Sequence, residues 1–391
     1  MKTAFILAYR NLIGAGLRTW LNVIVLSFSF VVIIWMKGIL AGWDHQAKTD
    51  MQNWQIGGGQ YWQENYDPYD PFTLTESHAV IPETLRNEIS SGNMVPVLIT
   101  QGTIYPAGRM QTILIKGISP HQNLLMLPTQ YLDTVTSSIP AIIGASMARA
   151  NKLNKGDHIT LQWRDANGTF DATDVLITHI FSTNVPAIDG GQIWIPLKKL
   201  QSMMLLSGQA TVLTFRDSGK DRPKLAGWKL KPTKELTAEI DQLIKTKSIG
   251  QSVFYIILLL LALLAIFDTQ VLSIFRRQKE IGTYIALGYT RREVVGLFTI
   301  EGAMHAVLAA VLSAAYGIPF LLWQANTGWT LPVEASDYGM AMAQTLYPVY
   351  SAGLVLSTIL IVMLATTVVS YWPSRRIAKM NPTEALRGKI Q

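Results

Sequence analysis

Few residues of this 391-residue chain could carry out chemistry by themselves. The chain has no cysteine, so thiol catalysis and cysteine-based metal sites are excluded, and its six histidines are scattered along the sequence. The sequence contains no GxxxxGK[ST] phosphate loop, no HExxH motif and no GxSxG motif. We therefore expect a non-catalytic protein with no catalytic residues, no metal site and no cofactor of its own.

Two carboxylates, those of Asp268 and Glu301, lie inside stretches that are otherwise apolar. At 1.5 Å per helical residue, both would lie about 10 Å from the same edge of a membrane. An intramembrane acid is costly and usually faces the protein interior. We favour a structural hydrogen bond, with His305 one turn from Glu301 as a candidate partner, and proton coupling is the alternative.

Hydropathy predicts the elements that position these residues. Hydrophobic residues make up 49% of the chain and charged residues 15%, and about 20 apolar residues in a helix cross a bilayer. Four stretches have that length: 20–42, 249–275, 294–323 and 350–372. Basic residues outnumber acidic ones in 1–19, 276–293 and 373–391, and none occurs in the loop 324–349. The positive-inside rule therefore places both termini in the cytoplasm and the 43–248 domain outside.

The 43–248 domain mixes strand and helix patterns, so the predicted fold is an α+β domain inserted between the first two of four membrane helices. Strands are expected at 111–116, 141–144, 158–163, 174–181, 191–195 and 211–215, and helices at 146–153 and 196–205. Asn167-Gly168 predicts a hairpin turn, because both residues tolerate positive φ. Acidic and basic residues balance in this domain, so no nucleic-acid partner is expected.

The segment 54–72 combines aromatic residues with glycine and Asp-Pro breakers, which predicts a loop. The favoured interpretation is that its aromatic side chains pin the loop to its own domain. The alternative is that they grip an amphipathic or acylated substrate.

Further features of the predicted helices bear on mechanics. Residues 1–19 are expected to form a cytoplasmic amphipathic helix at the membrane surface. A helix near 233–248 would run into the second span, either as a stalk that carries motion outward or as an ordinary packed helix. Small residues at four-residue spacing in the third span would let helices approach closely, within the chain or across a dimer: Gly302, Ala306, Ala310 and Ala314.

The 276–293 loop alternates charged and apolar residues, so a short helix there would have one charged side and one apolar side. Gly288 would end this helix and Thr290 would cap the next. Charge alone would favour a basic loop that obeys the positive-inside rule. The full pattern of residues favours instead a coupling helix that docks in a groove of a partner. The candidate coupling residues are Arg276, Arg277, Lys279, Glu280, Ile281, Gly282, Ala286, Leu287, Gly288, Arg291 and Arg292.

The 373–391 tail also predicts a helix, because Asn381 can cap it, Pro382 suits its first position and Glu384 completes a capping box. A helix this near a terminus is expected to dock on a partner. The candidate contacts are Arg375, Arg376, Asn381, Pro382, Glu384 and Leu386.

Two motifs, Arg276-Arg-Gln-Lys-Glu-Ile-Gly282 followed by Ala286-Leu-Gly288, and Asn381-Pro-Thr-Glu-Ala-Leu-Arg387, resemble a known family. It is the permease family of ABC transporters that includes the macrolide exporter, the lipoprotein-releasing permeases and the cell-division permease. The layout is most similar to the lipoprotein-releasing permeases. The resemblance implies a multi-pass protein of a bacterial inner membrane, with a periplasmic 43–248 domain.

The resemblance also implies partners. It implies a second permease, identical or related, and two copies of a separate ABC ATPase that bind ATP and magnesium. Membrane lipid and a periplasmic adaptor or lipoprotein acceptor are further expected contacts. The function implied is transmission of ATP-driven motion to the periplasmic domain, in order to extract or export a lipoprotein or another amphiphile. The alternatives are efflux of drugs or peptides with an adaptor, and control of a periplasmic hydrolase.

Overall fold

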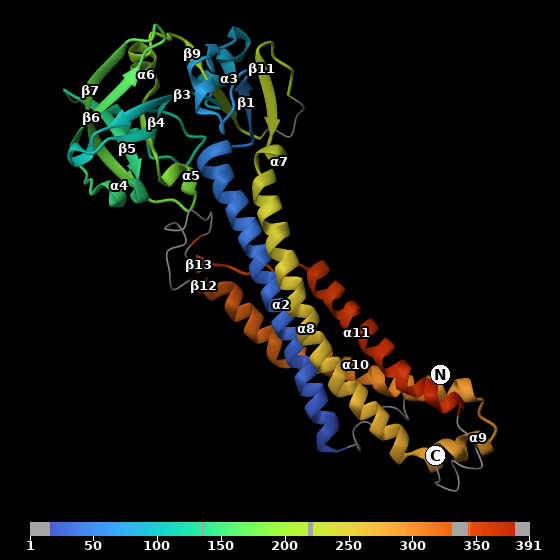
Figure 1. Ribbon diagram of the computed structural model, residues 1–391. Coiled ribbons are helices and arrows are strands. Elements are labelled where there is room, and N and C mark those ends of the chain that lie inside the picture. Colours follow the sequence, from blue (N-terminus) through green and yellow to red (C-terminus); the bar gives the residue numbers. More distant parts are fainter. Residues whose placement is uncertain (1–15, 135–136, 218–221, 331–342, 344, 380–391) are drawn as a thin grey trace. The chain divides into compact units, whose positions relative to one another are not determined.

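The computed structural model describes residues 16–134, 137–217, 222–330, 343 and 345–379. The chain divides into two compact units. The first unit comprises Met1–Gly42, Ile244–Trp329 and Tyr347–Gln391, and the second comprises Trp43–Leu243 and Thr330–Leu346. The division falls within two long helices, α2 (Leu17–Met51) and α8 (Ala238–Arg276), which are coloured blue and yellow in Figure 1.

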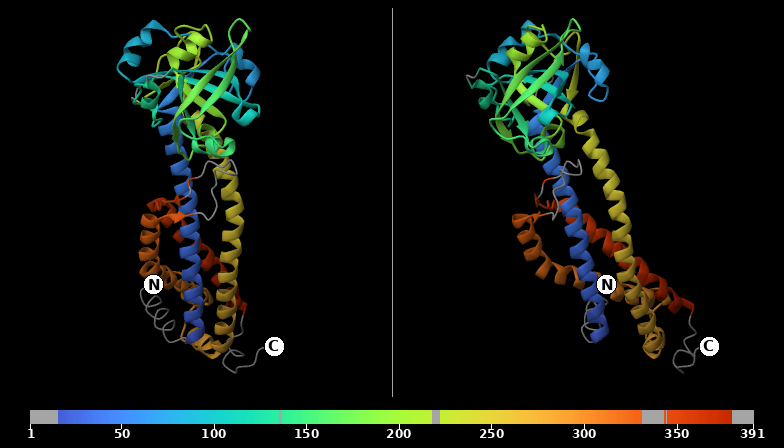
Figure 2. Two further views of the ribbon diagram at one scale, coloured as in Figure 1. Left: turned by 90° about the vertical axis from the view of Figure 1, so that its left-hand side faces the viewer. Right: turned by 60° about the vertical axis from the view of Figure 1, so that its left-hand side comes forward.

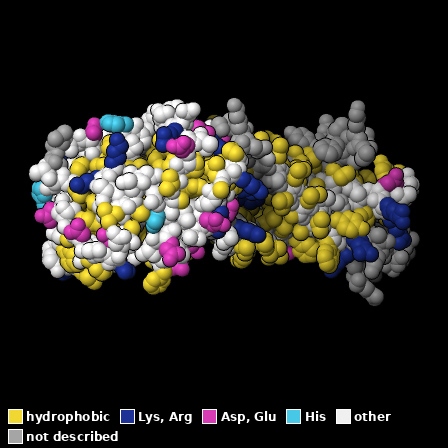
Figure 3. Space-filling model, turned by 90° about the horizontal axis from the view of Figure 1, so that it is seen from above, with side chains coloured by type: hydrophobic (Ala, Val, Ile, Leu, Met, Phe, Trp, Pro, Cys, Tyr) yellow, Lys and Arg dark blue, Asp and Glu magenta, His cyan; other side chains and the backbone are white. Residues whose placement is uncertain are grey.

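Within the described part of the chain, four helices are long and apolar enough to cross a membrane. They are α2, α8, α10 (Arg291–Thr327) and α11 (Ala352–Ser374), which Figure 2 shows in two further views. The first three predicted spans lie within α2, α8 and α10, and the fourth starts at residue 350, just before α11. Hydrophobic side chains cover much of the visible surface of these helices (Figure 3), as a lipid-facing surface requires.

The four helices enclose an apolar core. It consists of Val23, Leu26, Phe30, Ala262, Ile266, Ala306, Ala309 and Val362, all buried. The small residues of α10 contribute to it, since Gly302 lies so close to α11 that an added Cβ would be 2.2 Å from the Ser370 hydroxyl oxygen. The stripe then turns outward, because Ala310 is half-buried and Ala314 is exposed. The first half of the stripe therefore packs within the chain.

The second unit is α+β, as predicted, and is built on a nine-stranded sheet with the order β11-β1-β10-β3-β4-β8-β5-β7-β6. A further antiparallel pairing of β3 with β6, with Gly102 opposite Trp163, closes the six strands from β3 to β6 into a ring. The strands are β1 (Gly59–Gln63), β3 (Met94–Ile104), β4 (Gln111–Ile118), β5 (Ile139–Gly144), β6 (His158–Arg164), β7 (Phe170–Phe181), β8 (Gln192–Pro196), β10 (Val212–Phe215) and β11 (Trp228–Pro232).

Short elements complete this unit. The helices are α3 (Arg86–Ser90), α4 (Ala145–Asn151), α5 (Pro186–Asp189), α6 (Leu197–Met203) and α7 (Thr233–Leu236), and two short strands, β2 (Ala79–Val80) and β9 (Gln209–Ala210), pair with each other. Among the described residues, β12 (Trp329–Thr330), at the boundary of the two units, pairs with β13 (Thr345–Leu346). Residues of β3, β4, β5 and β8 are buried on both faces, because one apolar cluster fills the ring and a second covers its outside. The Asn167-Gly168 turn between β6 and β7 is confirmed, with Gly168 at a φ of 86°.

The prediction of a loop over 54–72 is wrong in its centre, because β1 lies there between β10 and β11. Tyr61 of β1 is fully buried and donates a hydrogen bond to the carbonyl oxygen of Pro223 at 2.8 Å. Trp62 packs edge-on against Tyr66, with ring centroids 5.1 Å apart. Most of these aromatic side chains are thus held by the domain, whereas Phe72 is 90% exposed.

The helix predicted over 233–248 is interrupted at Thr237, which separates α7 from α8. From Ala238 onward α8 is continuous to Arg276, and so includes the whole predicted second span. On the other long helix, α2 extends past the predicted span to Met51 and is followed by a π-helical turn over Gln52–Ile56. The predicted amphipathic helix over 1–19 falls almost entirely outside the described residues.

The close contact at Gly302 gives a test of the helix packing. A methyl group at this position would clash with Ser370, so Gly302→Ala should destabilise the protein by about 1–3 kcal/mol. The matched control is Gly296→Ala on the same helix, where an added Cβ would meet nothing within 4 Å. The melting temperature of the purified protein in detergent measures both. Equal melting temperatures for the two variants would show that α10 and α11 do not pack as described.

Candidate functional site

The predicted coupling segment forms the short helix α9 (Gln278–Ala286), which Figure 1 shows between α8 and α10. One residue, Arg277, separates it from α8. Gly288, at a φ of 97°, ends the turn after α9. Thr290 caps α10, as predicted, and forms a capping box with Glu293: the Glu293 amide donates to the Thr290 hydroxyl at 3.3 Å, and the Thr290 amide donates to the Glu293 carboxylate at 2.8 Å.

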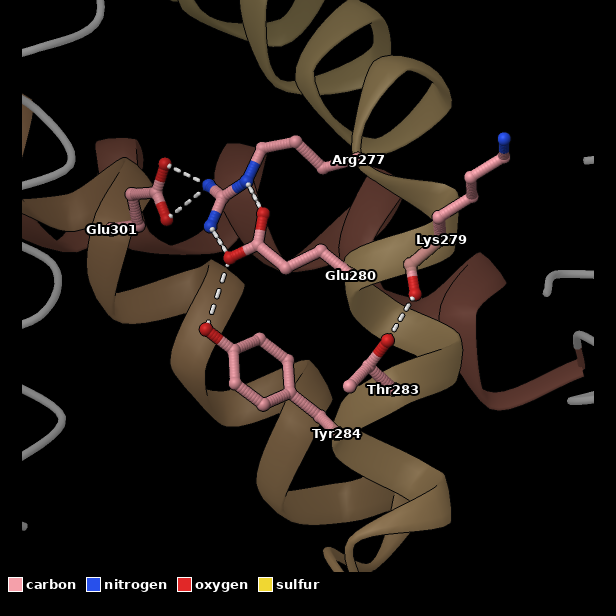
Figure 4. A network of polar contacts seen from close by, with 6 residues as sticks. All are labelled: Arg277, Lys279, Glu280, Thr283, Tyr284 and Glu301. Atoms are coloured by element: carbon pink, nitrogen blue, oxygen red, sulfur yellow. Dashed lines mark hydrogen bonds and ion pairs between the residues drawn. The ribbon is translucent and has the colours of Figure 1, made fainter.

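Arg277 is the centre of a polar network that joins α9 to α10 (Figure 4). Its Nη1 donates to both carboxylate oxygens of Glu301, at 2.7 and 2.8 Å. Its Nε and Nη2 donate to the carboxylate of Glu280 at 2.6 and 2.7 Å. The Tyr284 hydroxyl donates to Glu280 at 2.9 Å, and the guanidinium lies 4.8 Å from the ring centre of Phe298. One side chain thus connects the end of α8 with both following helices.

The electrostatics of this network favour charged side chains. The Glu301 side chain is only 8% exposed and that of Arg277 21% exposed, so water screens their attraction weakly. The hydrogen bonds of Glu280 raise the pKa of Arg277, although burial opposes the shift. The same hydrogen bonds from Arg277 lower the pKa of Glu280. Both groups therefore stay charged around neutral pH.

The apolar side of α9 packs into a small core of its own. Its buried members are Ile274, Ile281, Val294, Val295, Phe298 and Ile377, with Tyr284 and Ile285 packed against them. Ile377 belongs to a 3₁₀ turn, Arg375–Lys379, that follows α11. This core therefore holds α9 against α10 and against the segment after α11.

The structure divides the candidate coupling residues into two groups. Those whose side chains or backbone face inward are Arg277, Glu280, Ile281 and Gly282. Those that are exposed are Arg276, Lys279, Ala286, Leu287, Gly288, Arg291 and Arg292, together with Arg375 and Arg376 beyond α11. The remaining predicted contacts, Asn381, Pro382, Glu384 and Leu386, lie outside the described residues. Only the exposed group can meet a partner directly.

The two intramembrane acids differ from each other. Glu301 faces the interior, but its partner is Arg277 and not His305, whose Nδ1 lies 3.1 Å from the Gly302 carbonyl oxygen. Asp268 is exposed on α8, which differs from the expectation that both acids face inward. It lines a shallow groove with Asn22, which donates to the Thr269 hydroxyl at 2.6 Å. Among the described residues, no group of three metal-binding side chains occurs.

Part of this chain is similar in sequence to known proteins. Residues 252–382 match the family model of the FtsX-like permease C-terminal domain. An uncharacterized ABC transporter permease of Methanocaldococcus jannaschii is 29% identical over 161 residues, which are 39% of this chain and 37% of that protein. A macrolide export ATP-binding/permease protein of Yersinia pestis is 25% identical over 154 residues, which are 39% of this chain and 20% of that protein.

The periplasmic region of MacB from Actinobacillus actinomycetemcomitans aligns with 50% of this chain and 98% of its own, at 12% identity and a TM-score of 0.31. The chain spans about a third or less of the curated relatives described above. Residues 252–382 are therefore similar to the C-terminal domain of FtsX-like permeases, and both curated relatives are described as ABC transporter permeases or as fusions that contain one. Neither curated relative is described as a lipoprotein-releasing permease, so the predicted similarity to that group is not supported by these comparisons.

The Arg277–Glu301 pair gives a second prediction. Arg277→Met leaves the buried Glu301 carboxylate without a cation, which should cost about 3–5 kcal/mol of unfolding free energy. The double variant Arg277→Met/Glu301→Met removes both charges and should recover most of that loss. The unfolding free energies of Arg277→Met, Glu301→Met and the double variant, measured in mixed micelles, would form a double-mutant cycle. Additive effects of the two substitutions would show that the pair contributes no coupling.

Proposed function

We propose that this chain is the non-catalytic permease subunit of an ABC transporter and transmits the motion of a separate ATPase to the β-rich unit. The observation that carries this proposal is the position of Arg277. Because its guanidinium binds α9 and α10 from the end of α8, a force on α9 acts on both long helices. The continuity of α8 from Ala238 to Arg276 supports transmission along the same helix.

In this proposal the ATPase docks on the exposed residues of α9 and of the turn after α11, with both termini in the cytoplasm of a bacterial inner membrane. Arg276, Lys279, Arg375 and Arg376 supply positive charge there, and Leu287, which is 72% exposed, supplies an apolar contact. The inward-facing residues Arg277, Glu280 and Ile281 hold α9 in place. The ATPase pair would bind and hydrolyse ATP with magnesium, and a second permease, identical or related, would complete the assembly.

The packing of the four helices bears on the kind of work done. Leu26, Phe30, Ile266 and Ala306 are fully buried in one apolar cluster, so the four helices pack closely around these side chains. A substrate would therefore be acted on at the outer face of the membrane and not carried through the bundle. Extraction or export of a lipoprotein or another amphiphile fits this arrangement, with membrane lipid and a periplasmic adaptor or acceptor as further partners.

The docking surface can be tested by charge reversal. Arg276→Glu/Lys279→Glu should reduce co-purification of an ABC ATPase from native membranes by roughly tenfold, since like charges across an interface oppose association. The matched control is Lys198→Glu/Lys199→Glu, two exposed lysines of α6 in the other unit.

Size-exclusion chromatography would check that both variants insert and fold. Full retention of the ATPase by Arg276→Glu/Lys279→Glu would contradict the docking surface. ATP hydrolysis by the purified chain alone would contradict the non-catalytic role.

A further inference from the structure

Lys116 occupies a core position of the β-rich unit. It lies on β4, on the same face as Leu114 and Ile118, and is opposite Ile99 of β3 and Trp194 of β8 in the sheet register. Only 7% of the residue is exposed. Lysine is almost never fully buried unless it is paired, so this position needs an explanation.

In the part of the chain that the structure describes, the Lys116 ammonium has no counter-ion. Among the described residues, no carboxylate forms an ion pair with Lys116, and its one polar contact is with the face of the Trp194 ring, 5.0 Å from Nζ to the ring centre. Burial alone lowers the pKa of Lys116 to about 8. The lysine is therefore still protonated at neutral pH, in surroundings that favour an added anion.

Lys116 lines a cavity of about 460 Å³, a size typical of small-molecule sites. Most of the wall is apolar, formed by side chains such as Val97, Leu114, Leu125 and Val212. Two further polar atoms of lining residues, Oε1 of Gln55 and Nε1 of Trp194, are buried without a hydrogen-bond partner in the described part of the chain. Buried polar groups are normally satisfied, but these two atoms have almost no accessible surface, so Lys116 is the lining residue whose charge the argument uses.

We infer that this cavity binds an amphiphile that has one anionic head, a carboxylate or a phosphate, on an apolar chain. The head takes its hydrogen bonds from the ammonium of Lys116, and the chain lies against the apolar wall. This site goes beyond the proposed coupling role and does not depend on it.

The rim of the cavity supports a singly charged, largely apolar ligand. Lys231 pairs with Glu235, and the Tyr69 hydroxyl donates to Glu239, so the charges at the rim already have partners. The two carboxylates disfavour ligands with several negative charges, such as nucleotides. Tyr69 is 74% exposed and gives the rim an aromatic surface.

The test uses the full chain in phosphatidylcholine nanodiscs, with empty nanodiscs as the lipid baseline. Tritiated dodecanoate, dodecyl phosphate and dodecanol share one apolar chain and differ in the head. Both anionic probes should bind more tightly than dodecanol. Binding of dodecanoate alone would point to fatty acids as the natural source, and preference for dodecyl phosphate would point to phospholipid-derived ligands. Equal retention of all three probes would overturn the inference.

Lys116→Met keeps the length of the side chain and removes the charge. It should weaken binding of dodecanoate at least about tenfold, as expected for loss of a charged hydrogen-bond donor, and leave dodecanol binding unchanged. The control Lys198→Met, on an exposed position of the same unit, should bind as the wild type does. Lys116→Met should also raise the melting temperature, because it removes an unpaired buried charge. Undiminished dodecanoate binding would exclude Lys116 as the anchor.

A measurement on the wild type covers the case in which Lys116→Met fails to fold. Dodecanoate affinity should fall as the pH rises through about 8, the pKa of the unoccupied Lys116, whereas dodecanol affinity should not change. The other titratable groups that line the cavity are Tyr66, Tyr69, Lys231, Glu235 and Glu239. Burial raises the pKa of Tyr66 to about 12, and the hydrogen bond to Glu239 raises that of Tyr69 to about 12. Affinity for dodecanoate that is constant to pH 10 would contradict the site.

Discussion

The guanidinium of Arg277 lies between two carboxylates, and the arrangement of α8, α9 and α10 depends on it. Glu280 belongs to α9 and Glu301 to α10, so neither helix can rotate about its axis without breaking a short, charged hydrogen bond. Buried pairs resist disruption more than surface pairs do, because the charge left behind has no water to solvate it. In the proposed function, a push on α9 would therefore move α8 and α10 with it.

Two neighbouring arginines differ in this arrangement: one holds the helices together and the other faces outward. Arg276 is exposed and Arg277 is half-buried, although both belong to one basic motif. The motif could be recognised from sequence, and so could the Thr290–Glu293 capping box, because both depend on residues close together in the chain. The partner of Glu301 could not be predicted in this way. It lies 24 positions away, and only the turn after α8 brings it near. The one available signal is that an intramembrane acid requires a cation, for which His305 was the nearer candidate.

The difference between local and long-range contacts also explains which parts of the fold could be predicted. The membrane spans follow from the length of apolar stretches, and β6 follows from strict alternation, with Ile159, Leu161 and Trp163 buried. β1 is short and contains glutamines, and its partners come much later in the chain, since Gln60 is opposite Thr214 of β10 and Lys231 of β11. β3 contains Pro96 inside an apolar run, which argues against a central strand, yet it pairs with three strands. These two strands form because they pair with distant segments, and the local sequence pattern does not predict that pairing.

The charges of Arg277 and Lys116 are compensated to different degrees. Arg277 is offset by two carboxylates, whereas Lys116 is offset by none. A pKa lowered from 10.5 to about 8 corresponds to about 3 kcal/mol of lost stability at neutral pH. This cost is present below about pH 8 and disappears above the pKa of the unfolded chain. Methionine would fill the same volume without it, so stability alone does not account for a lysine there. Natural proteins depart from local packing rules mainly at functional sites, and the cavity beside Lys116 is where such a function would be exercised.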